Sequence, residues 1–580
     1  MSSGRGRRPG PTHGNRGRGR GSGPASPSTP RRGRGVDRGS HHSHSHPSPT
    51  VDMAEFPRQQ DLIEVVRDLE AGMADDTRKP TLPPPRPTPE GISELLAAIF
   101  KLEKRDRLQV EPSRREGNPL TIPSHSPIEP SKRVAEVLDS LASLSVCQPK
   151  HEVIAVALRL DPKARSVEFI VSGNSEIPSY TLNHMNYMWS SMKALSDFMY
   201  AERPPNLQDK SPNEMIKDPA FQAIVAEFNH RCLAFSFARL QQKVNGKFGQ
   251  FMTIPTTGLA PDHPFISLRQ SLSYLERLFT RKEGAAYGKP HHDDSRNWKY
   301  LYTCLRTFSQ SSAQFLHGGG FQGNDKRRSL GFPKLHSYLQ KIASIFNNIE
   351  ILLKAAISPR CRDILTCRPK FTPLPKLSGK LPHIAGNSRD WERVLEESLA
   401  YYNKYLDVTN TTNQVLDMKV IKPDAAYMAR EAVSKDVIVH CETKLLASIE
   451  RAQNERANIP KAFTYIGVSK LSCNGCACFF AAYNRVHDTT WMTKGGHGKS
   501  YYPWMFPPVL PGRDQVLAST YSIVVGRWVN SYRGYRHQFV PLVADSTAQS
   551  SRSVPATGYY DEQSPAQMQE MEEIMRNLGH

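Results

Sequence analysis

The stretch that decides the fold reads V-H-C-E-T-K-L-L from Val439 to Leu446 and then Y-I-G-V-S-K-L-S-C-N-G-C from Tyr465 to Cys476. Among twenty His, only His440 has a Glu two positions later, and among nine Cys, only Cys473 and Cys476 form a C-x-x-C. An isolated H-x-E can occur by chance in a chain of this size. Both motifs together, in this order, are typical of a site in which one His and two Cys hold a zinc ion.

The residues around the first motif predict its local structure. Good helix formers follow from Lys444 to Ala452, which places His440 and Glu442 near the start of a helix. The β-branched and aromatic run 462–468 predicts a buried strand, which leads toward the second motif.

We expect Cys473 to begin another helix over 474–483. Because Cys473 and Cys476 are three positions apart, their thiols lie on one face of its first turn, where the helix dipole favours thiolates. Cys478 lies two positions further on and points to the opposite side, so it is not expected to be a ligand.

A zinc ion takes four ligands, so one His and two thiolates leave one position open for water, as in catalytic zinc sites. Such a water has a pKa of about 7 and is a nucleophile. Glu442 is within reach of it and is the expected catalytic residue, carrying a proton from the water to the base and its leaving amine.

On these residues the chain resembles the cytidine-deaminase-like superfamily, and most of all a deaminase-like branch expanded in fungi that carries large helical insertions. The resemblance rests on H-C-E at His440–Glu442, on the 465–476 stretch and on G-H-G-K-S-Y-Y-P-W at Gly496–Trp504, and it covers about a quarter of the chain. The family usually has Pro before the first Cys, where this chain has Ser472. The resemblance implies a zinc-dependent hydrolase that deaminates a base.

The length of 580 residues allows two or three domains, or one domain with large insertions. A net charge of +20 favours partners that carry phosphates. Irregularly spaced Cys argue against a disulfide framework and favour an intracellular, nuclear or cytoplasmic location. Neither a long apolar run nor an apolar secretory segment is found in the sequence, so we expect no membrane span.

Residues 1–52 are expected to form a disordered, Arg/Gly-rich tail, because a sequence this polar cannot bury a core. Such tails bind RNA or single-stranded DNA through phosphate contacts and stacking, although a solvated tail with no specific role is an equal alternative. Its only acidic residues are Asp37 and, at its end, Asp52, and its arginines are Arg5, Arg7, Arg8, Arg16, Arg18, Arg20, Arg31, Arg32, Arg34 and Arg38.

The sequence predicts short helices and Pro-rich linkers over 53–130, including helices at 54–73 and 91–105. A helix over 131–144 and a hairpin of strands 153–160 and 166–172 would open the folded core in 131–180. Between this hairpin and the zinc motif, 181–425 are predicted to be a helical insertion. The predicted helices are 181–201, 212–243, 265–283, 296–314, 333–357 and 389–407. A separate helical domain is the alternative.

The zinc-binding core is expected over 426–545, followed by a linker and an acidic, amphipathic helix at 561–578 within 546–580. Aromatic and basic residues after the motif suit a flipped or single-stranded base, but they fit equally well as core residues of further strands, one of them over 517–528. The candidate substrate contacts are Trp491, His497, Lys499 and Trp504.

The expected fold is therefore α/β: a cytidine-deaminase-like mixed sheet with zinc-site helices, interrupted by a large helical insertion. The expected function is hydrolytic deamination of a cytosine or adenine base, free or in nucleic acid. One alternative is a non-catalytic nucleic-acid-binding or interaction protein with a structural zinc; another is a zinc hydrolase of a different kind. The carboxylate of Glu442 separates them, because a structural zinc needs no such group beside it.

Overall fold

The structure of this protein is a computed structural model. It covers 87–105, 129–150, 152–200, 212–280, 295–321, 332, 335–381, 385–406, 425–429, 436–456 and 458–535. The predicted Arg/Gly tail, the helix at 54–73 and the acidic helix at 561–578 lie outside the described residues.

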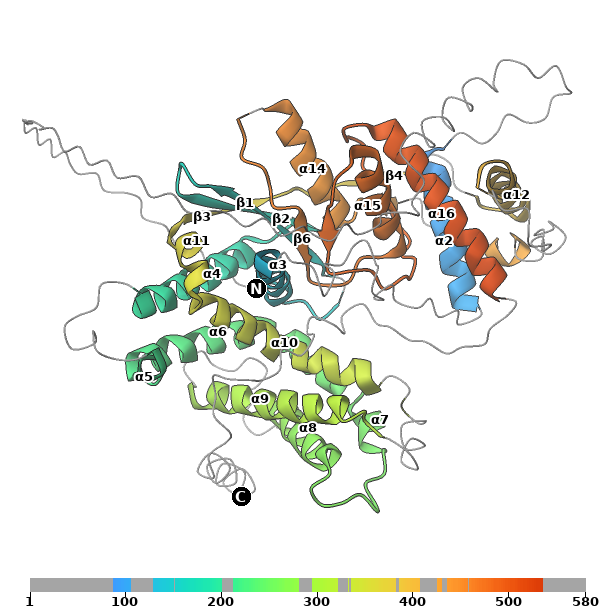
Figure 1. Ribbon diagram of the computed structural model, residues 1–580. Coiled ribbons are helices and arrows are strands. Elements are labelled where there is room, and N and C mark those ends of the chain that lie inside the picture. The colour runs from blue at the N-terminus through green and yellow to red at the C-terminus, as the bar shows by residue number, and fades with distance from the viewer. Residues whose placement is uncertain are drawn as a thin grey trace, which may run out of the picture. The chain divides into compact units, whose positions relative to one another are not determined.

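A five-stranded mixed sheet holds the site, with the strand order β3-β2-β1-β6-β7 (Figure 1). The predicted hairpin forms as β1 (Ile154–Asp161) and β2 (Ser166–Gly173), which pair antiparallel over their full length. On its other side β1 pairs antiparallel with β6 (Tyr465–Val468), and β6 pairs in parallel with β7 (Met492–Thr493). The hairpin and the strand before Cys473 therefore share one sheet although about 300 residues separate them in the chain.

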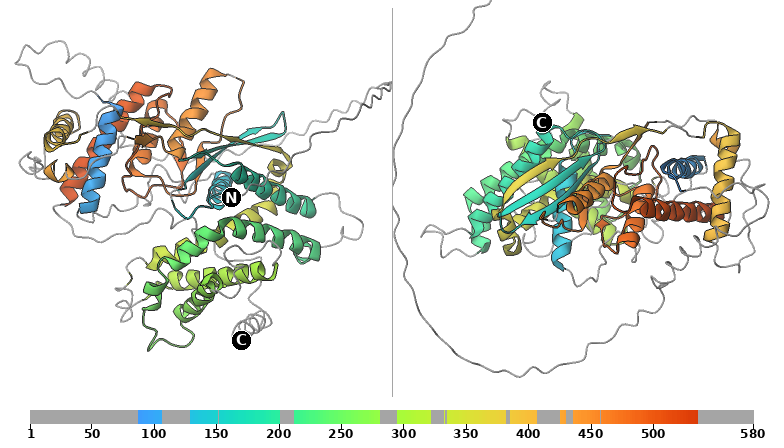
Figure 2. Two further views of the ribbon diagram at one scale, coloured as in Figure 1. Left: turned by 180° about the vertical axis from the view of Figure 1, so that it is seen from behind. Right: turned by 90° about the horizontal axis from the view of Figure 1, so that it is seen from above.

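Alternate residues of β1 enter two different cores, as the two-residue period of a strand requires. Val156 and Leu158 join one apolar cluster, while Ala155 and Ala157 join the other. Both faces of the sheet are thus covered, as the continuous apolar run of β1 indicates. Contacts with the strands place α3 (Glu129–Leu144) and α4 (Ser179–Tyr200) on the first side and α14 (Cys441–Glu455) on the second (Figure 2).

The described residues of the region predicted as a helical insertion are mostly helical. Its helices are α4, α5 (Pro212–Ile216), α6 (Pro219–Asn245), α7 (Phe248–Met252), α8 (Pro264–Thr280), α9 (Ser295–His317), α10 (Leu335–Ala356), the short 3₁₀ helix Pro359–Cys361, α11 (Arg362–Thr366) and α12 (Ser388–Tyr405). It also supplies two strands that the sequence did not predict. These are β3 (Arg368–Pro373), which pairs in parallel with β2, and β4 (Ser378–Lys380), which pairs with β5 (Asp436–Ile438).

The prediction of a strand over 517–528 is wrong, because this segment lies inside α16 (Arg513–Tyr535). Its buried residues recur at intervals of three and four positions, at Leu517, Tyr521, Val524, Val525 and Trp528. That is the period of a helix face. β-branched and aromatic residues suggested a strand, but packing of this face on α15 (Asn474–His487) overrides that preference.

The folded part also begins earlier than predicted, since α2 (Pro89–Arg105) belongs to the core around the zinc motif. Its residues Leu95, Leu96 and Ile99 are at most 2% exposed. The helix packs on α16. The Pro-rich composition of 106–130 predicts a boundary, but α2, which precedes this stretch in the chain, packs into the core that follows it.

The β6 strand approaches α3 so closely that Gly467 has no room for a side chain. A Cβ at this position would lie 2.4 Å from the backbone carbon of Leu138. We expect Gly467→Ala to lower the free energy of unfolding by about 1–3 kcal/mol, as for overpacked cores. Urea denaturation measures this.

The matched control for that substitution is Gly526→Ala in α16, where no atom lies within 4 Å of the added Cβ. A helical Gly→Ala change at such a position stabilises by up to about 1 kcal/mol. Equal urea midpoints for the two variants would contradict the close approach of α3 and β6.

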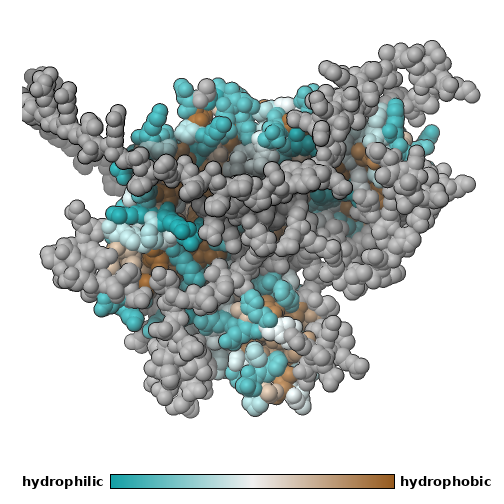
Figure 3. All heavy atoms as spheres, viewed as in Figure 1, coloured by the Kyte–Doolittle hydropathy of each residue, from teal (hydrophilic) through white to brown (hydrophobic). Residues whose placement is uncertain are grey.

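On the face in Figure 3 the described side chains are largely hydrophilic, with small apolar patches between them. In the described part of the chain, no helix combines the length and apolar character needed to cross a bilayer. All nine Cys lie within the described residues, and none of them forms a disulfide.

Candidate metal centre

The first helix of the site begins directly at the metal motif. His440 is the N-cap of α14, with extended backbone (φ −61°, ψ 149°), and its carbonyl accepts the amide of Lys444 at 2.9 Å. The first amide of the helix, that of Cys441, has no acceptor within the helix and donates to Oδ1 of Asn174 at 3.0 Å. Asn174 directly follows β2, so the end of the hairpin fixes the position of His440.

A buried lysine ties the same helix to two neighbouring segments. Nζ of Lys444 donates to the carbonyls of Gly173 at 3.0 Å and Pro375 at 2.7 Å, and the residue is only 3% exposed. Burial lowers the pKa of Lys444. The hydrogen bonds satisfy the ammonium at two strand ends and hold α14 against the sheet edge.

The second helix begins at the other motif, as predicted. Cys473 is the N-cap of α15, and the backbone N–H of Cys476 donates to its sulfur at 3.5 Å. Gly475 lies between them because a Cβ there would meet Cδ1 of Leu96 at 2.8 Å and the Trp504 ring at 3.2 Å. The close approach of α2 and Trp504 therefore explains the Gly of C-N-G-C.

These two helix starts bring His440, Cys473 and Cys476 together. Nδ1 of His440 lies 3.4 Å from each sulfur, and the two sulfurs are 3.4 Å apart. Tetrahedral zinc, with Zn–S about 2.3 Å and Zn–N about 2.0 Å, spaces its ligand atoms about 3.5–3.8 Å apart. The three groups are at most 9% exposed. In number, spacing and chemistry they fit a zinc ion, and within the described residues no fourth His, Cys or carboxylate joins the group.

The pKa values of the two thiols indicate that this group requires an added positive charge to hold both as thiolates. Burial opposes ionisation of Cys473, but its hydrogen bond with Cys476 and the charge of His440 outweigh that effect, and its pKa falls to about 5. Burial and the neighbouring Cys473 raise the pKa of Cys476 well above its ordinary value. One thiolate forms readily and the second requires further positive charge, which a divalent metal supplies.

Hydrogen bonds from neighbouring residues orient the side chains of the ligand group. The indole N–H of Trp504 donates to the sulfur of Cys476 at 3.4 Å, and the carbonyl of Trp504 accepts the hydroxyl of Ser93 in α2 at 2.8 Å. The His440 ring also bonds to the backbone carbonyl of Pro503. Such outer bonds fix the orientation of the ring and stabilise thiolate character, as in known zinc sites.

Glu442 is buried beside the three ligand groups. It is 5% exposed, and its Oε2 accepts the thiol of Cys441 at 3.2 Å. Its negative charge acts on His440, Cys473 and Cys476 alike. Among the described residues, no cationic side chain forms an ion pair with this carboxylate.

The predicted substrate contacts occupy different environments. Trp491 is in the core, 2% exposed, with its indole N–H donating to Glu450 at 2.6 Å. His497 is 1% exposed, and its Nδ1 accepts the amide of Lys499 at 3.0 Å. The carbonyl of Lys499 accepts the amide of Asn474 at 2.9 Å. Trp504 contacts a ligand atom, the sulfur of Cys476, and Cys478 lies outside the ligand group, as predicted.

Several residues that shape the site could not be predicted from the sequence. The Glu103 carboxylate in α2 accepts the amide of Ser500, and burial raises its pKa to about 8. The guanidinium of Arg527 in α16 donates to Oδ1 of Asn474 at 2.6 Å. These residues are distant in sequence from both motifs. Asn174 is likewise distant, 267 positions from the amide of Cys441 that it accepts.

Comparison with known proteins agrees with the motif. The family model of an OTT_1508-like deaminase matches residues 439–508, which include all three ligand groups and Glu442. No curated protein matches the chain, and no solved structure does. The match supports a deaminase-like family for this part of the chain, as the sequence indicates.

Proposed function

We propose that this protein is a zinc-dependent hydrolytic deaminase of a cytosine or adenine base, free or in nucleic acid. The observation that carries the proposal is the buried carboxylate of Glu442 beside a three-residue ligand group, within the segment that matches a deaminase family. A purely structural zinc has four protein ligands and needs no adjacent carboxylate.

In the proposed mechanism His440, Cys473 and Cys476 hold the metal. Bound zinc supplies a water activated near neutral pH. Deamination replaces the exocyclic amine of the base by the oxygen of water and releases ammonia, so protons must move from water to the ring nitrogen and to the amine. Glu442 carries them, because its carboxylate lies beside the ligand groups and is shielded from bulk water.

The proposed fold is a cytidine-deaminase-like sheet into which 181–425 are inserted. Supporting this proposal, β1 pairs with both β2 and β6, so the hairpin before the insertion completes the sheet that carries the motif. We propose that the chain belongs to the fungal branch of the superfamily, because a long helical segment lies between its hairpin and its zinc motif.

The experiment that tests the function is a substrate screen. Purified full-length protein is incubated with free nucleosides, single-stranded DNA and RNA, and ammonia release is measured together with base conversion. We expect turnover of one cytosine- or adenine-containing class. If zinc is bound and no class is converted, the alternative of a non-catalytic nucleic-acid-binding protein replaces this proposal.

The Arg/Gly tail is proposed to add affinity for RNA or single-stranded DNA without setting specificity. Deletion of 1–52 removes ten Arg side chains that can contact phosphates. We expect the deletion to weaken binding and to make log Kd less dependent on log salt, since each phosphate contact contributes a slope of about 0.7 for single strands. Fluorescence anisotropy with labelled oligonucleotides at several salt concentrations measures both, and an identical salt slope would contradict the proposal.

A further inference from the structure

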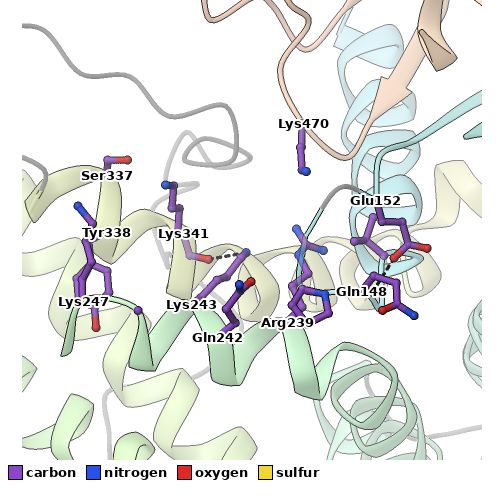
Figure 4. Close-up of a pocket in the computed structure, with 13 residues that line it drawn as sticks. Gln148, Glu152, Arg239, Gln242, Lys243, Lys247, Ser337, Tyr338, Lys341 and Lys470 are labelled. Atoms are coloured by element: carbon purple, nitrogen blue, oxygen red, sulfur yellow. Dashed lines mark hydrogen bonds between the residues drawn. The ribbon is translucent and has the colours of Figure 1, made fainter. Parts of the chain in front are cut away.

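A cavity of about 300 Å³ lies away from the three ligand groups, where the helical segment meets the zinc-site segment (Figure 4). Its walls are α6, α10, the turn after α3 and the loop after β6. In the close-up, Arg239 and Lys243 rise from α6 and Lys470 points toward them from the opposite wall. The cationic residues that line the cavity are Arg239, Lys243, Lys247, Lys341 and Lys470.

The cavity lining holds a single carboxylate, whose charge acts on Arg239 and Lys470. Glu152 is the one carboxylate in the lining, and its Oε2 already accepts the amides of Cys147 at 2.8 Å and Gln148 at 2.7 Å. Among the described residues no carboxylate forms an ion pair with Arg239, Lys243 or Lys470.

Neutral acceptors hold two of the cationic groups in place. Arg239 is 5% exposed and donates to the carbonyl and the hydroxyl of Ser143. Nζ of Lys243 donates to the carbonyl of Lys341 at 2.9 Å and to the hydroxyl of Ser344 at 3.3 Å. These bonds position the cations at the cavity without neutralising them.

The proximity of these cationic groups affects the pKa of Lys243. Burial and the charges of Arg239, Lys341, Lys494 and Lys470 lower its pKa well below the ordinary value for lysine. Like charges gathered at a half-buried position destabilise the folded state unless an anion joins them. The cluster therefore resembles a binding site whose counter-charge comes from a ligand.

We propose that this cavity binds a small soluble molecule carrying two or more phosphate groups. Several lysines and an arginine on different elements match several phosphate oxygens better than a single carboxylate. A volume near 300 Å³ is at the lower end for small-molecule sites, which favours a compact polyphosphate over a nucleic-acid strand. The proposal does not depend on the deaminase activity.

The ligand would join two parts of the chain. Lys470 precedes Cys473 by three positions, and the loop between them is tied to the β7 side, where the amide of Ser472 donates to the carbonyl of Gly495 at 2.9 Å. Arg239, Lys243 and Lys341 belong to α6 and α10 of the helical segment. A bound polyphosphate would thus stabilise the contact between the helical segment and the loop that leads into the metal motif.

The test uses the full chain with pyrophosphate, tripolyphosphate and ATP, each against sodium chloride of equal ionic strength. Isothermal titration calorimetry measures affinity, and differential scanning fluorimetry measures the melting temperature. We expect at least one of the three polyphosphates to bind and to raise the melting temperature. The double variant Lys243→Met/Lys341→Met should bind at least tenfold more weakly, because it removes two charge-assisted contacts.

The matched control is Lys354→Met, an exposed lysine of the same helix α10 that does not line the cavity. Its affinity and thermal shift should equal those of the wild type. Without polyphosphate, the melting temperature of Lys243→Met should equal or exceed that of the wild type, because the substitution removes repulsion among the cationic residues of the cavity. With polyphosphate, the wild type should have the higher melting temperature. Should a double variant unfold, Lys470→Gln in the loop provides the same affinity test.

Two outcomes would overturn the proposal. One is binding of none of the three polyphosphates, or binding that the cavity variants and Lys354→Met retain equally. The other is binding of a single-stranded oligonucleotide at the cavity, lost in the double variant, with no binding of any of the three polyphosphates. In that second case the cations would be part of a nucleic-acid path.

Discussion

Glu442→Gln should retain its zinc and its fold and lose a factor of about 10²–10⁴ in the rate of deamination. The amide has the size of the carboxylate and can still form hydrogen bonds, but it cannot carry a proton between water and base. Glu442 lies at the start of α14, buried beside His440, Cys473 and Cys476. The rate is measured on the substrate class that the screen identifies, with zinc content determined on the same sample.

The control for this variant is Glu455→Gln at the exposed end of the same helix, where the carboxylate pairs with Arg451 at 2.6 Å. That substitution removes the same charge from α14 and should leave the rate unchanged. A zinc-loaded Glu442→Gln enzyme that works at the wild-type rate would show that another group transfers the proton.

The ligand residues could be predicted from sequence because each lies at the start of a locally determined helix. His440 and Cys473 directly precede good helical sequence, and helix starts place residues one to three positions apart on neighbouring points of the first turn. The β1–β2 hairpin was predictable for a similar reason, since its turn and its apolar runs are contiguous.

The parts that could not be predicted depend on contacts distant in the chain. β3 is partly exposed, contains two prolines and becomes a strand because β2 offers a free edge beside it. α16 is rich in β-branched and aromatic residues and becomes a helix because one face packs on α15. In both segments local propensity is weak or misleading, and tertiary packing decides the structure.

The residues around the ligand group also could not be predicted, because their positions depend on contacts between distant parts of the chain. Trp504 follows from the G-H-G-K-S-Y-Y-P-W motif, but its bond to Cys476 depends on α2, which positions it through Ser93. α2 lies more than 400 positions away from Trp504 in the chain. The sequence therefore gives the identity of the candidate ligands, while the residues that orient them follow only from the fold.

Cys473→Ala should lose its zinc, falling from one ion per chain to below one tenth, as measured by elemental analysis of purified protein. Losing a group that merely orients a ligand already costs about 10- to 100-fold in metal affinity, and the loss of a ligand costs more. Cys473 also has the lower thiol pKa, about 5, so it supplies the thiolate that forms first. The melting temperature should fall as well, because binding energy of the metal stabilises the folded state.

Cys478→Ala is the control, since this thiol is in the same helix and equally buried but bonds to Asn474 rather than joining the ligand group. It should keep one zinc per chain. The comparison separates loss of a ligand from loss of a buried sulfur, because both variants remove one thiol from α15 or its cap. If Cys473→Ala retains full zinc, the metal is held elsewhere, and the assignment of His440, Cys473 and Cys476 as its ligands is wrong.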